Sequence, residues 1–585
     1  MTTIRPPLLI VALGAAFVLL PNLGGPPLWD EDEPRNAACS LAMHASGDWI
    51  VPTFNGRLRI EKPALVNWLH LAGFAVAGVN ETGARLGSAL LTIGTCMLTG
   101  GIAGRLFRPE VGIWAGLAMA TCLWTAVAGR AATPDAPLAF FTTLALWLFV
   151  RGGLPEGTTP EGIRGPVRLP AATALGIGVA CGLGILAKGP VGLALPLGAF
   201  MLFAWWLEPS ASERGTAGFG LASIRGRLSA VLPAWRGLRG LSIVAVAVAV
   251  AAPWYVLVGL RTDGEWLRGF LLVHNVGRFV TPMEGHSGSL LYYPVMLLVG
   301  TFPWSMAWIP AVQHAAGNLR RTDRPDERIG TLLLAAWLVA WLVPFTLAGT
   351  KLPGYIWPAY PALAGLTGLF VADWIRRPSA ATDGWMRLGW ACLAASGVAL
   401  GCCLPFVAHR HAPGTEWLGL VGAVPLAGAI AAWSLQSRES RGQAAAVWAT
   451  TAAATVVLLL GLGSASVGEV GGTRKLLADM PAGSPVGSFN APASATFYAG
   501  RLTPAGTVTE LADVDAAAAF VATRPGAFLV VAADSATELT TRLPADYRVL
   551  RSEVALPSSV NLLLVGPIAA DGDTDGIAWN DPPRP

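Results

Sequence analysis

The stretch that decides the fold is DEDEPRNAACSLAMHASGDWIVPTFNGRLRIEKP, which runs from residue 30 to residue 63. Four consecutive acids, residues 30–33, directly follow an apolar N-terminal segment, and Glu61, Lys62 and Pro63 close the stretch. Removing an ionised group from water is costly unless the group is paired or neutralised. We therefore predict a polar cavity at the mouth of a helix bundle, built largely from this stretch.

The composition indicates a polytopic membrane protein. Of the 585 residues, 53% are hydrophobic and only 13% are charged, and the mean hydropathy is +0.54. A soluble domain has about 25% charged residues. The net charge of +4 is small and most basic residues are arginines in short loops, so nucleic-acid binding has no support. The seven cysteines show neither a disulfide framework nor a zinc-binding spacing.

Thirteen apolar segments are candidate membrane helices, because about 20 apolar residues cross a bilayer and fewer suffice where it thins. They lie near residues 7–23, 84–104, 111–129, 136–150, 170–187, 189–207, 240–260, 291–312, 330–347, 355–374, 388–407, 416–434 and 445–464. The first segment also fits a signal peptide, since it is short and Arg5 precedes it. Alternate loops hold most arginines, and short loops rich in basic residues lie in the cytoplasm. An odd number of spans then puts the C-terminal tail on the external side.

The last part of the chain has a different composition. We divide the sequence into a transmembrane domain at residues 1–467 and a periplasmic α/β domain with a loose tail at residues 468–585. Strand-like runs such as GAFLVVAA at residues 526–533 alternate with helix-like pieces near residues 509–523 and 535–543. No nucleophile elbow, phosphate loop or metal-ligand cluster appears there, which favours a structural cap or a docking surface for a partner.

Polar residues recur in the loops on the side opposite the arginines. Asp135, in TPDAPL, begins a predicted membrane helix and is either a site residue or a helix cap. Lys188, in AKGPVG, lies at the turn between two predicted spans. It is either a phosphate ligand or a lysine that extends to the membrane surface.

A second polar loop contains HNVGRF at residues 274–279. Arg278 is a phosphate-binding candidate, because a planar guanidinium suits bidentate phosphate recognition. His274 and His286 either bind a divalent metal or an anion, or form hydrogen bonds at the membrane surface.

The last external motif is TKLPGYIWP at residues 350–358, which places Lys351 and Tyr355 at the start of a helix broken by proline. We expect the freed backbone carbonyls to face a cavity. One face of the membrane would then hold four cationic side chains: Lys62, Lys188, Arg278 and Lys351. Such a set suits phosphate binding while carboxylates act on an acceptor or a leaving group.

Taken together, these motifs resemble the lipid A aminoarabinose transferases and their relatives in the broad protein mannosyltransferase-like family. The resemblance rests on DEPRN and SGDWIVPTFNGRLRIEKP, followed by the four later motifs, and covers about residues 8–465. It implies an all-α polytopic membrane protein of the GT-C fold, with external juxtamembrane helices and the small C-terminal α/β domain. It also implies a glycosyltransferase that takes a sugar from a polyprenyl-phosphate donor at the periplasmic side of a bacterial inner membrane.

The resemblance also implies roles for individual residues. The catalytic positions would be filled by Asp32, Glu33 and Asp135. The donor phosphate would be bound by Arg35, Lys62, Lys188, Arg278, Lys351 and Tyr355. A divalent metal would be held by Glu61 and His274, with His286 as a further site residue. Two positions depart from the family pattern, because Asn36 stands in place of a tyrosine and Asn275 in place of a histidine.

The function that these features favour is transfer of the sugar, with inversion, to lipid A or another envelope glycolipid. A protein O-mannosyltransferase-like enzyme is the alternative within the family. A polyprenyl-lipid transporter would show inverted repeats and ionisable residues near the bilayer midplane, and neither is visible. An assembly protein that binds partners through its tail would give no reason for the four cations to share a face.

Overall fold

Helices occupy the thirteen apolar segments. The computed structural model describes residues 6–29, 32–154, 167–207, 231–282, 285–321, 323–463, 472–478, 480–503, 506–555 and 560–568. Within these ranges, nine helices are long and apolar enough to cross a membrane, or up to ten if a bent pair is counted as one span. The prediction of a polytopic membrane protein is confirmed, whereas the number of thirteen spans stays a prediction.

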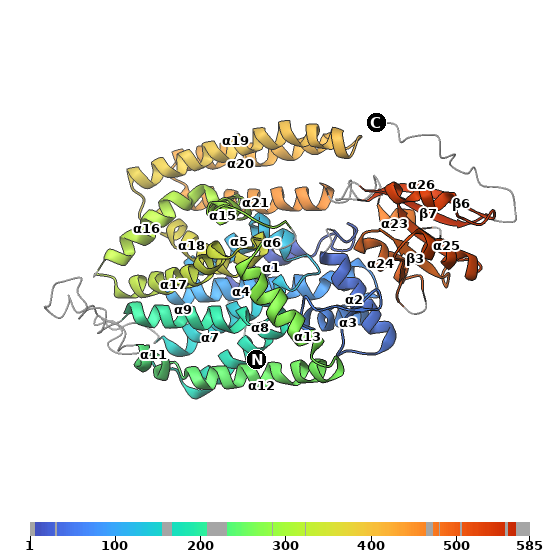
Figure 1. The fold of residues 1–585 in the computed structure, drawn as a ribbon. Helices are drawn as coiled ribbons and strands as arrows, with labels where there is room; N and C mark the ends of the chain where they lie inside the picture. Colours follow the sequence, from blue (N-terminus) through green and yellow to red (C-terminus); the bar gives the residue numbers. More distant parts are fainter. Residues whose placement is uncertain are drawn as a thin grey trace.

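The helical bundle is built from elements throughout the first four fifths of the chain (Figure 1). Its long helices are α1 (Pro6–Leu19), α4 (Glu81–Leu106), α5 (Pro109–Thr121), α7 (Asp135–Gly153), α8 (Ala171–Lys188), α9 (Val191–Leu207), α12 (Gly240–Arg261), α16 (Trp308–Arg320), α17 (Pro325–Leu347), α18 (Tyr360–Arg376), α19 (Ala380–His411), α20 (Ala423–Ser437) and α21 (Arg441–Leu458). Shorter helical pieces are α6 (Leu123–Ala128), α11 (Val231–Gly237), α13 (Glu265–Arg268), the π-helix η1 (Gly269–Gly277), α14 (Arg278–Val280), α15 (Tyr292–Gly300), η2 (Trp304–Ala307), η3 (Pro353–Ala359), η4 (Glu416–Gly422) and η5 (Leu459–Gly463).

The acidic first loop folds into two helices joined by a small hairpin. These are α2 (Asp32–Ser46), the antiparallel strands β1 (Thr53–Phe54) and β2 (Arg57–Leu58), and α3 (Leu65–Ala77). Two acids in the first turn of α2 interact favourably with the helix dipole, and Gly47, with φ of +70°, follows its last residue. Helix α3 follows the EKP motif, and its His70 is buried with Nδ1 2.9 Å from Ser40 Oγ.

Two predicted spans are interrupted. The segment at residues 291–312 does not form one straight helix, because its two halves are bent by 112° around Pro303, which has no N–H to donate to a helix. The segment at residues 111–129 breaks at Cys122, between α5 and α6. The two breaks meet, since the amide of Leu123 donates to the carbonyl of Phe302 over 3.0 Å.

The proline-rich motif forms the 3₁₀ helix η3 before α18 begins, so the predicted interruption is confirmed. The expectation that its freed carbonyls face a cavity stays a prediction. The carbonyl of Pro358 accepts a 2.7 Å hydrogen bond from Trp337 Nε1, and both residues are buried. A neighbouring indole therefore satisfies this backbone acceptor.

The last part of the chain forms a five-stranded sheet in the order β4-β3-β5-β7-β6. Its elements are α23 (Thr473–Leu476), β3 (Val486–Phe489), α24 (Ala493–Gly500), β4 (Thr509–Glu510), α25 (Val514–Thr523), β5 (Phe528–Ala532), η6 (Ala533–Ser535), α26 (Ala536–Thr540), β6 (Tyr547–Ala555) and β7 (Val560–Pro567). Strand β3 is parallel to β4 and β5, whereas β7 is antiparallel to β5 and β6. The predicted α/β character is confirmed.

Two details of that prediction are wrong. Thr509 and Glu510 were expected in a helix but pair with β3 as a strand, and α24 had no counterpart in the prediction. The proposed domain boundary and the tail after residue 568 lie outside the described residues. The C-terminal unit, residues 472–568, lies at the end of the bundle that carries α2 and α3 (Figure 1).

Small residues bring α8 and α12 into close contact. Gly178 and Gly182 are four residues apart on α8, as in the small-xxx-small pattern of membrane helix pairs. A Cβ at Gly178 would lie 2.7 Å from Val246 Cβ, and one at Gly182 would lie 2.7 Å from Val250 Cβ. The contact between these helices therefore depends on the absence of side chains at both glycines.

We expect Gly182→Val to destabilise the protein by about 1–3 kcal/mol, the usual cost of overpacking a close contact. Gly198→Val is the matched control, because Gly198 is also in an apolar helix but has nothing within 4 Å of an added Cβ. Thermal unfolding in detergent should show a lower midpoint for the first variant only. Equal midpoints for the two variants would contradict the proposed contact.

Candidate functional site

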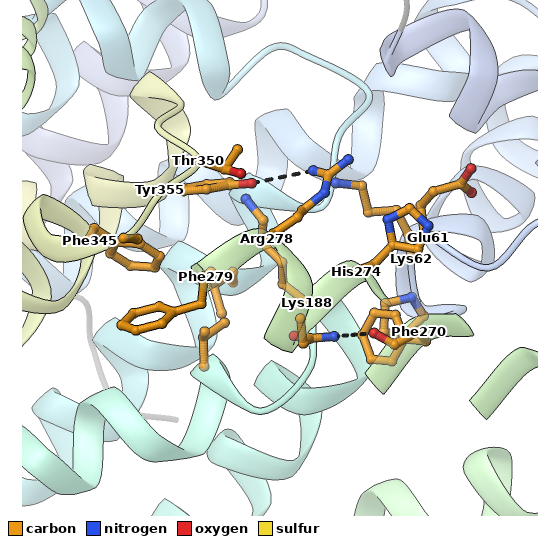
Figure 2. Close-up of a pocket in the computed structure, with 15 residues that line it drawn as sticks. Glu61, Lys62, Lys188, Phe270, His274, Arg278, Phe279, Phe345, Thr350 and Tyr355 are labelled. Atoms are coloured by element: carbon orange, nitrogen blue, oxygen red, sulfur yellow. Dashed lines mark hydrogen bonds between the residues drawn. The ribbon is translucent and has the colours of Figure 1, made fainter. Parts of the chain in front are cut away.

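A pocket in the bundle collects side chains from five separate stretches of chain (Figure 2). The pocket is partly open to solvent, and its empty space of about 740 Å³ includes some of that open solvent. The lining residues are Glu61, Lys62, Pro63, Leu138, Lys188, Val191, Phe270, His274, Asn275, Arg278, Phe279, Phe345, Ala348, Thr350 and Tyr355. Six predicted site residues thus meet here: Glu61, Lys62, Lys188, His274, Arg278 and Tyr355.

Four polar side chains at this pocket form one connected group. Lys188, the last residue of α8, donates a hydrogen bond to Asp135, the first residue of α7. The Lys188 ammonium also lies 4.7 Å from the centroid of the Tyr355 ring, a distance typical of a cation–π contact. Arg278 Nη1 donates to the Tyr355 hydroxyl over 3.4 Å (Figure 2). The fold therefore joins four sequence motifs that are far apart in the chain.

Gly354 allows this arrangement. A Cβ at that position would lie 2.8 Å from Asp135 Oδ2, so the backbone of η3 passes directly beside the carboxylate. The start of η3 and the start of α7 are thereby held together, which sets Tyr355 next to Lys188.

Asp32 and Lys62 are coupled electrostatically. The Lys62 ammonium holds the pKa of Asp32 below its usual value, and Arg59 contributes in the same direction while burial opposes them. Burial lowers the pKa of Lys62, because a charged amine loses hydration there, and Lys188 adds to this effect. Asp32 is therefore ionised at neutral pH and available as a hydrogen-bond or proton acceptor beside the pocket.

Part of the pocket lining is apolar. The residues that form it, which we call the apolar wall, are Leu138, Val191, Phe270, Phe279 and Phe345. Phe279 is 51% exposed, and the neighbouring residues Leu272 and Val276 of η1 are also exposed. The cationic side chains thus border an apolar surface, which suits an amphiphilic ligand with a charged head.

Glu33 does not face this pocket, in contrast to its predicted catalytic position. It is 4% exposed and forms an ion pair with Arg85, with Glu33 Oε2 2.7 Å from Arg85 Nη2. Its two oxygens also accept hydrogen bonds from the amides of Trp29 and Ala132, both over 2.7 Å. Burial alone would raise the pKa of Glu33, but the Arg85 guanidinium lowers it below its usual value. The geometry is that of a structural anchor.

Arg85 completes this anchor. Its guanidinium donates to the carbonyls of Leu23, Pro26 and Pro27 over 2.8–3.1 Å, in addition to Glu33. The pair therefore fixes the segment that leads to Asp32 and, through Ala132, the segment that leads to Asp135.

Arg59 is a structural residue of the site that the sequence prediction missed. It is 4% exposed and donates to Glu61 Oε2 over 3.3 Å and to Asn36 Oδ1 over 2.6 Å. Asn36, the departure from the family tyrosine, also donates to the carbonyl of Ala132 over 3.0 Å. The signal in the sequence was the i, i+2 spacing of Arg59 and Glu61, which places both on one side of an extended chain.

Lys351 and His286 are not among the residues that line the pocket. Lys351 Nζ donates to the carbonyls of Thr346 and Ala348 over 2.9 and 2.6 Å, at the C-terminal end of α17. Lys351, which was predicted to bind phosphate, thus caps the end of α17. A lysine ammonium satisfies the last free carbonyls of a helix and interacts favourably with its dipole. The side chain of His286 is exposed, and its carbonyl accepts from the amide of Lys351.

The remaining predicted residues are placed as follows. Arg35 stacks over Phe54, with its Cζ 5.8 Å from the ring centroid, and adds to the positive potential at Asp32. Glu61 and His274 both line the pocket, but no group of three or more possible metal ligands occurs in the described ranges. Asn275 donates to the carbonyl of Phe270 over 2.7 Å. Metal binding by Glu61 and His274 stays a prediction.

Comparison with known proteins identifies relatives of this chain. The family model described as dolichyl-phosphate-mannose-protein mannosyltransferase matches residues 28–238. An undecaprenyl phosphate-alpha-4-amino-4-deoxy-L-arabinose arabinosyl transferase of Pseudomonas aeruginosa (strain UCBPP-PA14) is 30% identical over 403 residues, which is 67% of this chain and 64% of that protein. The chain is an aminoarabinose-transferase-like member of the protein mannosyltransferase-like family.

Further relatives support the assignment. A protein of the same description from Pectobacterium carotovorum is 29% identical over 443 residues, covering 74% of this chain and 71% of that protein. The crystal structure of ArnT from Cupriavidus metallidurans bound to undecaprenyl phosphate has a TM-score of 0.74 at 22% identity and covers 97% of this chain and 98% of that one. The GT-C fold is thereby shown for this family member. The match to the Pseudomonas relative spans slightly less than two thirds of that protein's length.

We expect Arg85→Met to destabilise the protein by about 3–5 kcal/mol, because removing one partner of a buried ion pair leaves the other charge uncompensated. Arg57→Met is the control, since Arg57 is 74% exposed and lies 3.9 Å from Glu510 at the surface. An exposed pair of that kind contributes about 0–1 kcal/mol. Thermal unfolding in detergent measures both variants, and similar midpoints would show that Arg85 is not an anchor.

Proposed function

We propose that the protein is a membrane glycosyltransferase that transfers a sugar from a polyprenyl-phosphate donor, of the undecaprenyl class, to lipid A or another envelope glycolipid. The observation that carries this proposal is the convergence of Lys62, Lys188, Arg278 and Tyr355 on one pocket with an apolar wall. A phosphate head needs cationic donors, and a prenyl chain needs apolar surface. The names of the relatives support the proposal, since they describe transferases of an undecaprenyl-phosphate sugar.

In this mechanism the donor phosphate binds between Lys62 and Arg278, with Lys188 and the Tyr355 hydroxyl in support. An acceptor oxygen attacks the anomeric carbon as the bond from that carbon to the phosphate oxygen breaks. The leaving group is polyprenyl phosphate, whose developing negative charge the cations stabilise. Attack opposite the leaving group inverts the anomeric centre.

Asp32 has one of two roles, depending on the acceptor. A hydroxyl acceptor loses a proton, which the ionised Asp32 carboxylate would accept as a general base. A phosphate acceptor is already ionised, so Asp32 would then orient the reacting groups. Asp135 keeps Lys188 in position in either case.

The cellular location is part of the same proposal. The arginine-rich loops indicate the cytoplasmic side, which puts the pocket and the C-terminal unit on the periplasmic side of a bacterial inner membrane. A transporter is less well supported, because Asp135 and Lys188 lie at helix ends, whereas transporter sites lie near the bilayer midplane.

We expect Lys62→Ala to reduce transfer by about 10²–10³-fold, the cost of losing one group that stabilises transition-state charge. For Asp32→Asn with a hydroxyl acceptor, we expect a loss of about 10²–10⁴-fold. Membranes supplied with a radiolabelled polyprenyl-phosphate sugar provide the assay. Asp515→Asn is the control, because that side chain is 82% exposed in the C-terminal unit. Full transfer by both site variants would remove this assignment.

The acceptor is identified by mass spectrometry of lipid A, envelope glycans and secreted proteins from cells with and without the gene. Loss of a lipid A modification supports the proposal. Loss of a mannose from proteins would instead support an O-mannosyltransferase, the activity for which the matching family model is described.

We expect donor affinity to fall as the pH rises. This fall should occur at a lower pH than the range in which an ordinary lysine titrates. Burial lowers the pKa of Lys62, so the ammonium loses its proton earlier and the attraction to phosphate is lost. Lys62→Arg should move this loss to higher pH, since arginine stays charged. Lys475→Arg, at a 51% exposed position, should leave the pH profile unchanged. Binding of a polyprenyl phosphate from neutral to alkaline pH is the measurement, and identical profiles for Lys62→Arg and wild type would contradict the prediction.

A further inference from the structure

The C-terminal unit shares a hydrophobic core with the first loop. Buried residues of one cluster come from both parts of the chain, among them Leu28, Ala38 and Leu41 on one side and Phe497 and Tyr498 on the other. Figure 1 shows α24 of the C-terminal unit beside α2. The unit therefore packs directly on the helix whose first residue is Asp32.

Two glycines allow this close approach. A Cβ at Gly500, the last residue of α24, would lie 3.2 Å from Leu41 Cδ2. Gly506 has a φ of +64°, and a Cβ there would lie 2.9 Å from Ala45 Cβ. The backbone of the C-terminal unit is thus in contact with the side of α2.

A buried hydroxyl connects the unit to the segment before Asp32. Tyr498 is 5% exposed, and its hydroxyl accepts a 2.8 Å hydrogen bond from the amide of Leu28. The same hydroxyl donates to Glu81 Oε1 over 3.1 Å. In a site of low dielectric constant such a network is strong when every member has its partner.

Glu81 strengthens the connection. Its carboxylate is within 3.2 Å of Arg474 and 3.6 Å of Arg501, both from the C-terminal unit. Glu81 begins α4, one helical turn before Arg85, which holds Glu33. The C-terminal unit and the Arg85 anchor therefore fix the same segment from adjacent turns of α4.

We propose that the C-terminal unit is a positioning element for Asp32, and that Tyr498 is its contact residue. The proposal deepens the proposed function and rests on it for the reaction. Tyr498 does not contact the reacting groups. It holds the amide of Leu28, four residues before Asp32. Loss of the Tyr498 hydroxyl should therefore leave phosphate binding by Lys188 and Arg278 intact and disturb only the placement of the Asp32 carboxylate.

The first test does not depend on activity. Hydrogen–deuterium exchange of the full-length protein in detergent is compared for wild type, Tyr498→Phe and Tyr547→Phe. Tyr547 is the matched control, because it belongs to a separate hydrophobic cluster of the C-terminal unit. We expect exchange in the peptide containing Leu28 to rise about fivefold in Tyr498→Phe, the effect of losing one buried hydrogen bond, and to stay unchanged in Tyr547→Phe. Unchanged exchange in Tyr498→Phe would overturn the proposal.

The second test uses transfer from a radiolabelled polyprenyl-phosphate sugar. We expect kcat of Tyr498→Phe to fall about tenfold while KM for the donor stays unchanged, since a displaced Asp32 carboxylate slows only the chemical step. A rise in KM with unchanged kcat would overturn the positioning role. If wild type transfers no sugar but exchange at Leu28 still rises in Tyr498→Phe, the contact stands and the proposed function fails.

Discussion

The structure depends on pairing charges where water is scarce. An ionised side chain in a low-dielectric environment is stable only beside an opposite charge with its hydrogen bonds satisfied. Glu33 meets this condition with Arg85, and Asp135 meets it with Lys188. At the opposite ends of the long helices, Arg108 pairs with both Glu327 and Asp373. These pairs join elements that are distant in the chain, so they determine which helix ends lie together.

The same constraint gives the pocket its chemistry. Lys62, Lys188 and Arg278 come from three different elements and lie around one space. Bringing such groups together is unfavourable without nearby acids, and Asp32 and Asp135 supply them. A phosphate head would add negative charge to a region where basic groups are concentrated, which is the electrostatic basis for binding it. The apolar wall beside them would receive the hydrophobic part of the ligand.

The C-terminal unit changes how the first loop should be understood. The sequence suggested a structural cap or a docking surface for a partner, and the structure gives this unit a common core with α2 and a hydroxyl contact with the amide of Leu28. A loop with four consecutive acids would otherwise repel itself and remain in water. Arg85 from the bundle and Tyr498 from the C-terminal unit anchor the segment before this loop, at Pro27 and Leu28 respectively.

The sequence by itself determined the membrane class, the helical segments and the charged residues that line the pocket, because hydropathy and residue type are local properties. It also indicated the family, since the motifs that carry the site keep their order and spacing. Only the tertiary structure separated Asp32 from Glu33. Adjacent residues at the start of a helix point about 100° apart, so one faces the pocket region and the other faces Arg85. Lys188 and Lys351 are likewise similar in sequence, and each is followed within two residues by proline. Their roles differ because Lys188 ends a helix opposite Asp135, whereas Lys351 folds back on the free carbonyls of α17. Such directions depend on neighbouring elements, which no local pattern specifies.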